Sequence, residues 1–264
     1  MRTDIKRIAF LTFKQVVSTT WFWIGNILAV AMVIGYENGI YKFFNDGTIE
    51  GKMYFFQAFS VIMMFVFFLL YGNSIAQNVV EEKRTKMTES VLYRIKPINL
   101  LRAKIIGYLF GAFTQLVLIA ATLLLSKPVI GIKVDVNDYK KIILLFATLL
   151  LGLTMYLFVF AVFASRIQNI NDFSKIIFPG VMMLIVSFIL SLIIIKCSTP
   201  SICRALMFIP FISPCIAIGC VIQDIPRVIT NFELVLYLFL MAAQSAFVSH
   251  ICTKLYEKAL KSEK

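Results

Sequence analysis

The sequence predicts an all-α integral membrane protein with six transmembrane helices, and three observations lead to this prediction. The 264-residue chain is 60% hydrophobic and 15% charged, with a mean hydropathy of +0.87. A soluble domain is nearer to about 45–50% apolar and about 25% charged, so a large soluble core does not explain this composition. Six stretches are apolar over the length of about 20 residues that crosses a bilayer. Lysine and arginine are also distributed unevenly between the connections that join these stretches.

Short polar connections separate the six predicted spans, and none of them is long enough for a soluble domain. The longest connection, residues 196–233, has 38 residues and is itself half apolar. The predicted spans are residues 19–36, 53–76, 105–125, 142–164, 176–195 and 234–252.

The distribution of positive charge predicts that both termini lie in the cytoplasm. With the N-terminus inside, the inner segments carry 17 of the 26 Lys and Arg residues and the outer segments carry 9. This is the orientation that the positive-inside rule favours. The net charge of +12 is then explained by orientation and by contact with anionic lipid, and it does not indicate a nucleic-acid partner. We therefore expect a multi-pass protein of the cytoplasmic (plasma) membrane.

A seventh apolar stretch, residues 205–222, is predicted to enter the membrane from outside without crossing it. Its two internal prolines lie four residues apart, and each removes a backbone donor. A seventh crossing would also place the basic C-terminus outside. Irregular backbone within a membrane persists only where it is buried in protein or lines a cavity. This re-entrant hairpin is a candidate outer gate, although a hairpin that only packs the outer ends of the bundle fits the pattern equally well. The candidate gate residues are Phe208, Pro210, Phe211 and Pro214.

The N-terminal residues 1–18 mix basic and apolar side chains. Arg2, Lys6, Arg7 and Lys14 alternate with isoleucine, phenylalanine, leucine and valine. Such a mixture predicts an amphipathic helix that lies in the inner membrane interface before the first span.

The longest charged run follows the second predicted span. Residues 76–96 contain neither Gly nor Pro, so nothing in them interrupts a helix. Pro97 ends such a helix, because the residue before a proline is disfavoured in the α region. We therefore predict a separate helix from Glu81 to Ile95, within the segment 80–96, along the inner membrane surface.

The residues after this run are expected to open the third span. Asn99 is a suitable N-cap for its helix. Arg102 and Lys104 are expected to hold its inner end at the lipid headgroups.

The charged run carries both signs of charge, and orientation alone requires only Lys and Arg. Mixed charges suit a surface that docks a protein, because opposite charges set the register of an interface. A solvated loop is an equally good interpretation on physical grounds. The residues of the candidate docking surface are Glu81, Glu82, Lys83, Arg84, Thr88, Glu89 and Arg94.

The run "VVEEKRTKMTESVLYRIKPINLLRAKIIG" resembles the segment between the second and third spans of type-2 ABC exporter permeases. In that family an E-E-K start precedes a helix with a Thr/Glu pair, a proline break, and a lysine that opens the third span. The stretch "FIPFISPCIAIG", residues 208–219, resembles the proline-containing outer segment of the same permeases. The matching residues of the first motif are Glu81, Glu82, Lys83, Thr88, Glu89, Pro97 and Lys104.

The resemblance implies a dimer of permease subunits, identical or different, that works with two separate ABC ATPase subunits. The charged helix would dock the ATPase, and ATP and Mg²⁺ would bind to the partner, with no cofactor bound by this chain. The sequence contains no G-x-x-x-x-G-K-[ST] motif, so it has no P-loop of its own. The short connection between the first two spans favours the compact exporters of drugs, lipids and antimicrobial peptides. A sodium-type efflux permease remains an alternative.

The six predicted spans contain no Asp, Glu, Lys or Arg. Ion-coupled transport normally needs ionisable groups within the membrane, so an ATP-independent transporter is a weaker alternative. An immunity or sensor protein with the same fold is a further one. Asn26, Gln57 and Gln115 could line a substrate path, or they could form interhelical hydrogen bonds.

Metal and nucleophile chemistry are poorly supported by the sequence. The five cysteines form no C-x-x-C pair, and His250 is the one histidine. We therefore expect no metal site and no catalytic residue. A disulfide between Cys197 and Cys203 in an outer loop stays open.

Overall fold

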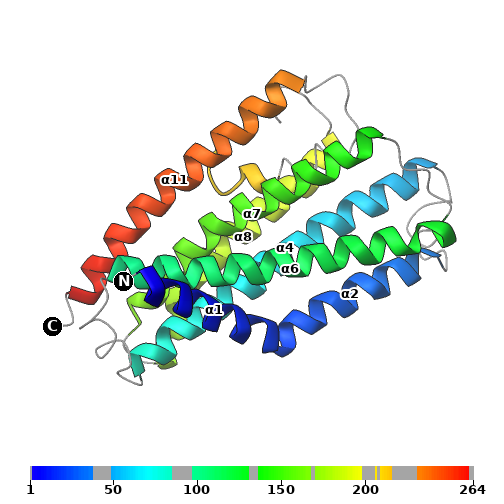
Figure 1. Cartoon of the computed structure of the whole chain (residues 1–264). Coiled ribbons are helices and arrows are strands. Elements are labelled where there is room, and N and C mark those ends of the chain that lie inside the picture. Colours follow the sequence, from blue (N-terminus) through cyan, green and yellow to red (C-terminus); the bar gives the residue numbers. More distant parts are fainter. Residues whose placement is uncertain are drawn as a thin grey trace.

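The computed structural model is an elongated bundle of long helices (Figure 1). It describes residues 2–37, 49–84, 97–130, 136–167, 170–197, 206, 209–215 and 231–261, and this part of the chain contains no strand. The all-α fold is therefore confirmed for the described residues. The elements are α1 (Arg2–Ser18), α2 (Thr20–Glu37), α4 (Ile49–Arg84), α6 (Pro97–Ile130), α7 (Val136–Ser165), the 3₁₀ helix η1 (Ile170–Asp172), α8 (Phe173–Cys197) and α11 (Asn231–Lys261).

Five described helical segments are long and apolar enough to cross a membrane. They coincide with the second to the sixth predicted spans. The first predicted span, 19–36, coincides with α2, and its crossing stays a prediction. The five segments are Val61–Arg84, Pro97–Thr122, Phe146–Ser165, Phe173–Ile193 and Leu236–Ala259.

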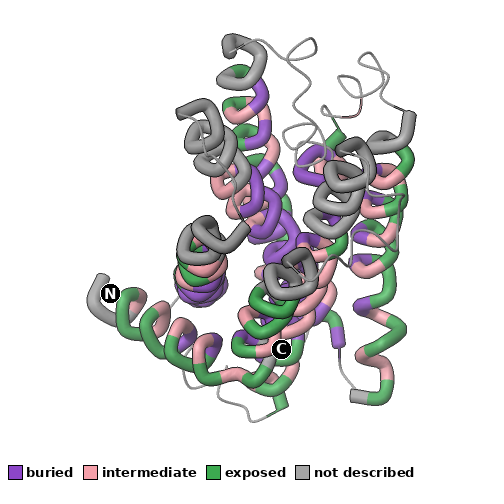
Figure 2. Tube along the Cα trace, turned by 90° about the vertical axis from the view of Figure 1, so that its right-hand side faces the viewer, coloured by how far each residue is buried: buried purple, intermediate pink, exposed green. Residues whose placement is uncertain are grey.

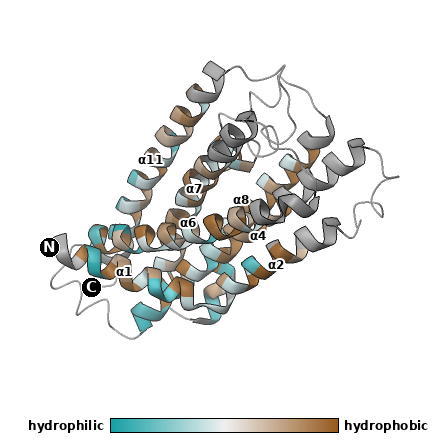
Figure 3. Ribbon diagram, turned by 45° about the vertical axis from the view of Figure 1, so that its right-hand side comes forward, coloured by the Kyte–Doolittle hydropathy of each residue, from teal (hydrophilic) through white to brown (hydrophobic). Residues whose placement is uncertain are grey.

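The start of α1 and the end of α11 lie at the same end of the bundle (Figure 1). The total of six spans stays a prediction. Hydrophilic residues gather at this end, as Figure 3 shows by hydropathy. We call it the polar end, and it is formed by α1, the last turn of α4, the first turns of α6 and the connection between α7 and α8.

Helix α1 runs across the polar end and packs against α6. The close approach depends on Gly107, because a Cβ at this position would lie 2.6 Å from the Ala9 carbonyl oxygen and 2.6 Å from Thr12 Cβ. Val16 on α1 is buried. A helix therefore exists where the sequence predicts one, and its place in the membrane interface stays a prediction.

Helix α7 is the centre of the bundle. It packs against α4, α6, α8 and α11, and 67% of its apolar segment is buried, against 28–44% for the other four candidate spans. Figure 2 shows the buried residues in the interior between the long helices. Large apolar side chains cover much of the outside, and Phe239 is 72% exposed. An apolar exterior of this kind is what a lipid environment accommodates.

The structure differs from the sequence prediction at the charged run. Glu81–Arg84 form the last turn of α4 and do not begin a separate helix. The reason is that no glycine or proline interrupts the backbone hydrogen bonds after the second span. The remainder of the predicted helix, residues 85–96, lies outside the described residues.

The next helix also begins earlier than predicted. Helix α6 starts at Pro97, so Asn99 lies inside its first turn and is not its N-cap. Proline is well tolerated in the first turn, where the N–H that it lacks would have no helical partner.

Candidate functional site

The docking residues predicted from the sequence divide into two groups. Glu81 and Arg84 are exposed in the last turn of α4, and Glu82 and Lys83 are partly buried. Thr88, Glu89 and Arg94 lie outside the described residues. The part of the docking surface that the structure describes is therefore one helical turn with two exposed charges.

Lys83 joins α4 to the end of α7. Its Nζ donates hydrogen bonds to the carbonyl oxygens of Ser165 (2.8 Å) and Ile167 (3.0 Å). The last carbonyls of a helix have no partner within it and carry partial negative charge, so a lysine there satisfies both needs. This sequence-predicted docking residue is thus a structural link between two helices.

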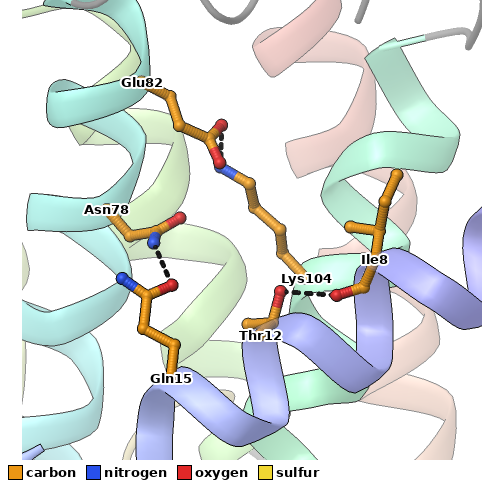
Figure 4. Close-up of polar contacts among 6 residues, drawn as sticks. All are labelled: Ile8, Thr12, Gln15, Asn78, Glu82 and Lys104. Carbon is orange, nitrogen blue, oxygen red and sulfur yellow. Dashed lines mark hydrogen bonds and ion pairs between the residues drawn. The ribbon is translucent and has the colours of Figure 1, made fainter.

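Glu82 joins α4 to α6 through Lys104. The Lys104 side chain is 2% exposed and Glu82 is 30% exposed, and Figure 4 shows the ammonium reaching the carboxylate between the helices. We expected both Arg102 and Lys104 at the lipid headgroups. The expectation is wrong for Lys104, which is buried, and Arg102 is exposed. The reason is that Glu82 provides an ionic partner inside the bundle, which compensates the burial of the ammonium.

Helix α1 is also tied to α4. Asn78 Nδ2 donates a hydrogen bond to Gln15 Oε1 at 3.0 Å (Figure 4). Asn78 Oδ1 is buried without a hydrogen-bond partner. Asn78 also lines a polar cavity of about 100 Å³ between α1, α4 and α6. Gln15, Val16, Thr19, Ser74, Gln77, Asn78, Glu81 and Tyr108 line this cavity.

Most of the candidate gate segment, Ile209–Cys215, lies inside the bundle, and its first residue, Ile209, is exposed. Pro210 and Phe211 are half-buried and Pro214 is buried, while Phe208 lies outside the described residues. Backbone hydrogen bonds fold the segment into a tight turn, with Ser213 N donating to Ile209 O at 3.0 Å. Its backbone is therefore irregular but internally bonded, as buried backbone must be.

Side chains of three helices hold this segment. Tyr156 on α7 donates its hydroxyl proton to the Phe211 carbonyl oxygen at 2.9 Å. Tyr237 on α11 does the same to the Ser213 carbonyl at 2.8 Å, and Ser187 Oγ on α8 lies 3.2 Å from the Phe211 carbonyl.

Packing fixes the depth of the segment. A Cβ at Gly152 on α7 would lie 2.6 Å from Pro214 Cβ, so glycine is required for this contact. Gly152 lies near the middle of the predicted span 142–164. The segment therefore reaches about half of the way along α7, deeper than an outer lid.

The three residues proposed to line a substrate path are placed differently from one another. Asn26 Nδ2 and Gln115 Nε2 both donate to the Phe22 carbonyl oxygen, at 3.0 and 3.3 Å. Gln115 Oε1 also accepts the hydroxyl of Tyr71 at 2.8 Å. Gln115 thus forms interhelical hydrogen bonds between α2, α4 and α6, and the side chain of Gln57 lies outside the described part of the chain.

Sequence reasoning missed the tyrosines. Tyr71, Tyr156 and Tyr237 each direct a buried hydroxyl to a specific acceptor on another element. A tyrosine within a predicted span was the available signal, because a buried hydroxyl normally finds a hydrogen-bond partner.

The described residues contain no cluster of His, Cys, Asp and Glu that could hold a metal ion. Cys215 and Cys252 are free and buried. The open question of a Cys197–Cys203 disulfide lies outside the described side chains.

Comparison with known proteins agrees with this architecture. Residues 38–251 match the family model described as ABC-2 family transporter protein. The uncharacterized protein YhaP of Bacillus subtilis (strain 168) is similar, with 25% identity over 169 residues. That match covers 59% of this chain and 40% of YhaP, so the chain spans less than half the length of that relative. The family match covers most of the helical bundle, and this multi-pass membrane protein therefore belongs to the ABC-2 family of transporter proteins.

Proposed function

We propose that the chain is the membrane-spanning permease subunit of an ATP-driven ABC exporter. The family match is the observation that carries this proposal, because ABC-2 membrane subunits generally work with an ABC ATPase. The chain has no P-loop and no ionisable Asp, Glu, Lys or Arg in its six predicted spans, which favours power from a separate ATPase. The substrate is a drug, a lipid or an antimicrobial peptide, moved outward across the cytoplasmic membrane.

The ATPase docks at the polar end, on the last turn of α4 and the adjoining segment 85–96. Glu81 and Arg84 support this assignment, because they present opposite charges outward within one turn. Two such ATPases and a second permease copy complete the transporter. The gate segment Ile209–Cys215 separates the substrate path from the outside until the ATPase pair changes state.

The docking experiment reverses the two exposed charges and leaves Glu82 and Lys83 unchanged. The tagged full chain carrying Glu81→Lys and Arg84→Glu is purified from native membranes in mild detergent, and an ABC ATPase is scored in the eluate by mass spectrometry. Loss of the ATPase with a normal gel-filtration profile is the expected result. Undiminished recovery of the ATPase would contradict docking at this turn.

Lys175→Glu is the matched control. The Lys175 side chain is 81% exposed at the polar end, where it pairs with Asp172, three positions before it. Reversal of this charge tests whether any charge change at the polar end removes the ATPase. The expected recovery of ATPase with Lys175→Glu equals that with the unaltered chain.

A sodium-type efflux permease or an immunity protein would share this docking turn. ATP-dependent efflux of a fluorescent drug or labelled lipid from vesicles that contain permease and ATPase supports the exporter. Efflux of ²²Na⁺ without efflux of the drug or lipid would show that the sodium-type permease is the correct alternative. Binding of the ATPase without efflux of any of these substrates would favour an immunity or sensor role.

A further inference from the structure

The Phe211 carbonyl is the acceptor on which the gate segment depends most. Two hydroxyls approach it, those of Tyr156 at 2.9 Å and Ser187 at 3.2 Å. Ser187 Oγ is also 2.8 Å from the Met183 carbonyl in its own helix. Ser187 Oγ also lies 3.1 Å from the Tyr156 hydroxyl. A serine hydroxyl has a single proton, and the Met183 oxygen is the nearest acceptor for it. The hydrogen bond from Tyr156 is then the one that satisfies Phe211.

The backbone at Phe211 needs such a partner. Its φ of 73° lies in the left-handed region, which residues other than glycine rarely adopt. Strained backbone of this kind persists where the surrounding structure holds it, and it occurs often at switch regions. Without the tyrosine hydroxyl, the Phe211 carbonyl keeps only the longer contact with Ser187 Oγ, in a conformation that is already disfavoured.

The other contacts of the segment involve atoms other than the Phe211 carbonyl oxygen. The Tyr237 hydroxyl binds the Ser213 carbonyl, two residues further along. The rings of Tyr156 and Phe211 meet edge to face, with centroids 5.8 Å apart, and removal of the hydroxyl alone leaves this ring contact in place.

We propose that Tyr156 is a positioning residue that latches the Ile209–Cys215 segment in its closed position, through one hydrogen bond to the Phe211 carbonyl. This inference rests on the proposed role of the segment as a gate. Release of the bond lets the strained turn relax and withdraws the segment from α7, which opens the path at mid-depth of the bundle.

Cys215 provides a direct reporter of the latch. It belongs to the segment and is 1% exposed in the closed structure. The other four cysteines are replaced by alanine, and a membrane-impermeant maleimide is added from outside to the full permease–ATPase complex. Tyr156→Phe is expected to raise the labelling rate of Cys215 by about 5- to 30-fold, the ratio that the loss of one buried hydrogen bond produces.

Two further variants keep the test decisive. Gly152→Ala leaves Tyr156 intact but pushes on Pro214, and it should also raise the labelling of Cys215. Tyr71→Phe removes an equally buried tyrosine hydroxyl whose partner is Gln115, and it should leave the labelling unchanged. Labelling at the unaltered rate in Tyr156→Phe would overturn the latch, as would an equal rise in Tyr71→Phe.

The same assay separates the latch from the gate. In the chain with Tyr156 intact, a gate requires that the labelling of Cys215 change when ATP is added. If ATP does not change the labelling rate of Cys215 but Tyr156→Phe raises it, the segment is not a gate. The hydrogen bond from Tyr156 then serves only to hold the segment in place. An ATP-dependent rate that Tyr156→Phe does not alter would retain the gate and refute the latch.

Discussion

Replacement of Glu82 by methionine is expected to destabilise the protein more than replacement of Lys104 by methionine. The two side chains form one ion pair, but Lys104 is 2% exposed and Glu82 is 30% exposed. In Lys104→Met, the Glu82 carboxylate loses its partner but is still partly hydrated. An ammonium that loses its partner at Lys104 stays buried, and water cannot replace the missing acceptor.

The unequal burial sets the magnitudes. Loss of one member of a buried ion pair costs about 3–5 kcal/mol, and Glu82→Met should lie near the lower value because one member of this pair is partly exposed. Lys104→Met leaves a half-hydrated carboxylate and should cost about 1 kcal/mol. The double variant removes both charges and should also cost about 1 kcal/mol, because apolar replacement of a buried pair is often nearly neutral. The coupling energy is then about 3 kcal/mol.

The measurement is the free energy of unfolding in mixed micelles, from titration with sodium dodecyl sulfate followed by circular dichroism. All three variants introduce methionine, so side-chain volume is matched across the cycle. Equal costs for the two single variants, or a double variant whose cost is their sum, would refute the reasoning.

The same unfolding assay tests three other contacts. Gly107→Ala should cost about 1–3 kcal/mol because the new methyl meets the backbone oxygen of Ala9. The new methyl of Gly111→Ala meets only the Val16 side chain, so this variant should cost less. A larger cost for Gly111→Ala than for Gly107→Ala would contradict this account. Gln115→Met should cost about 1–3 kcal/mol, because the Tyr71 hydroxyl and the Phe22 carbonyl both lose a partner. Asn78→Leu should change stability by less than about 1 kcal/mol, because it removes one hydrogen bond and one unsatisfied oxygen together. A larger loss would contradict this reasoning.

Hydropathy was sufficient to predict most of the bundle. The predicted spans 53–76 and 142–164 fall inside α4 and α7, because a bilayer demands a continuous apolar stretch and a helix satisfies its own backbone. The ends of the helices were less predictable. A helix continues into polar sequence until something stops it, so α4 extends to Arg84, beyond its apolar stretch.

The pairing of polar residues could not be predicted from the sequence. Lys104 has the composition and position of a headgroup anchor, and only the approach of α4 to α6 reveals Glu82 as its partner. Tyr156 and Phe211 are 55 positions apart, and no local pattern indicates that they meet. Hydrogen bonds between distant segments depend on which helices pack together, and a single sequence contains no direct record of that packing.

Helix α7 connects the two proposed functional regions. Lys83 binds the carbonyls at its end, and Tyr156 holds the gate segment about 14 Å away along the same helix, at 1.5 Å per residue. All side chains from Met155 to Val162 are buried, and a close-packed interior transmits displacement because it has little room to absorb it. A shift of α4 at the polar end therefore either breaks the bonds of Lys83 or moves α7 against the gate segment. The packing along α7 couples the two regions only if the polar end and the gate segment change their arrangement together. The dependence of the Cys215 labelling rate on ATP measures this coupling.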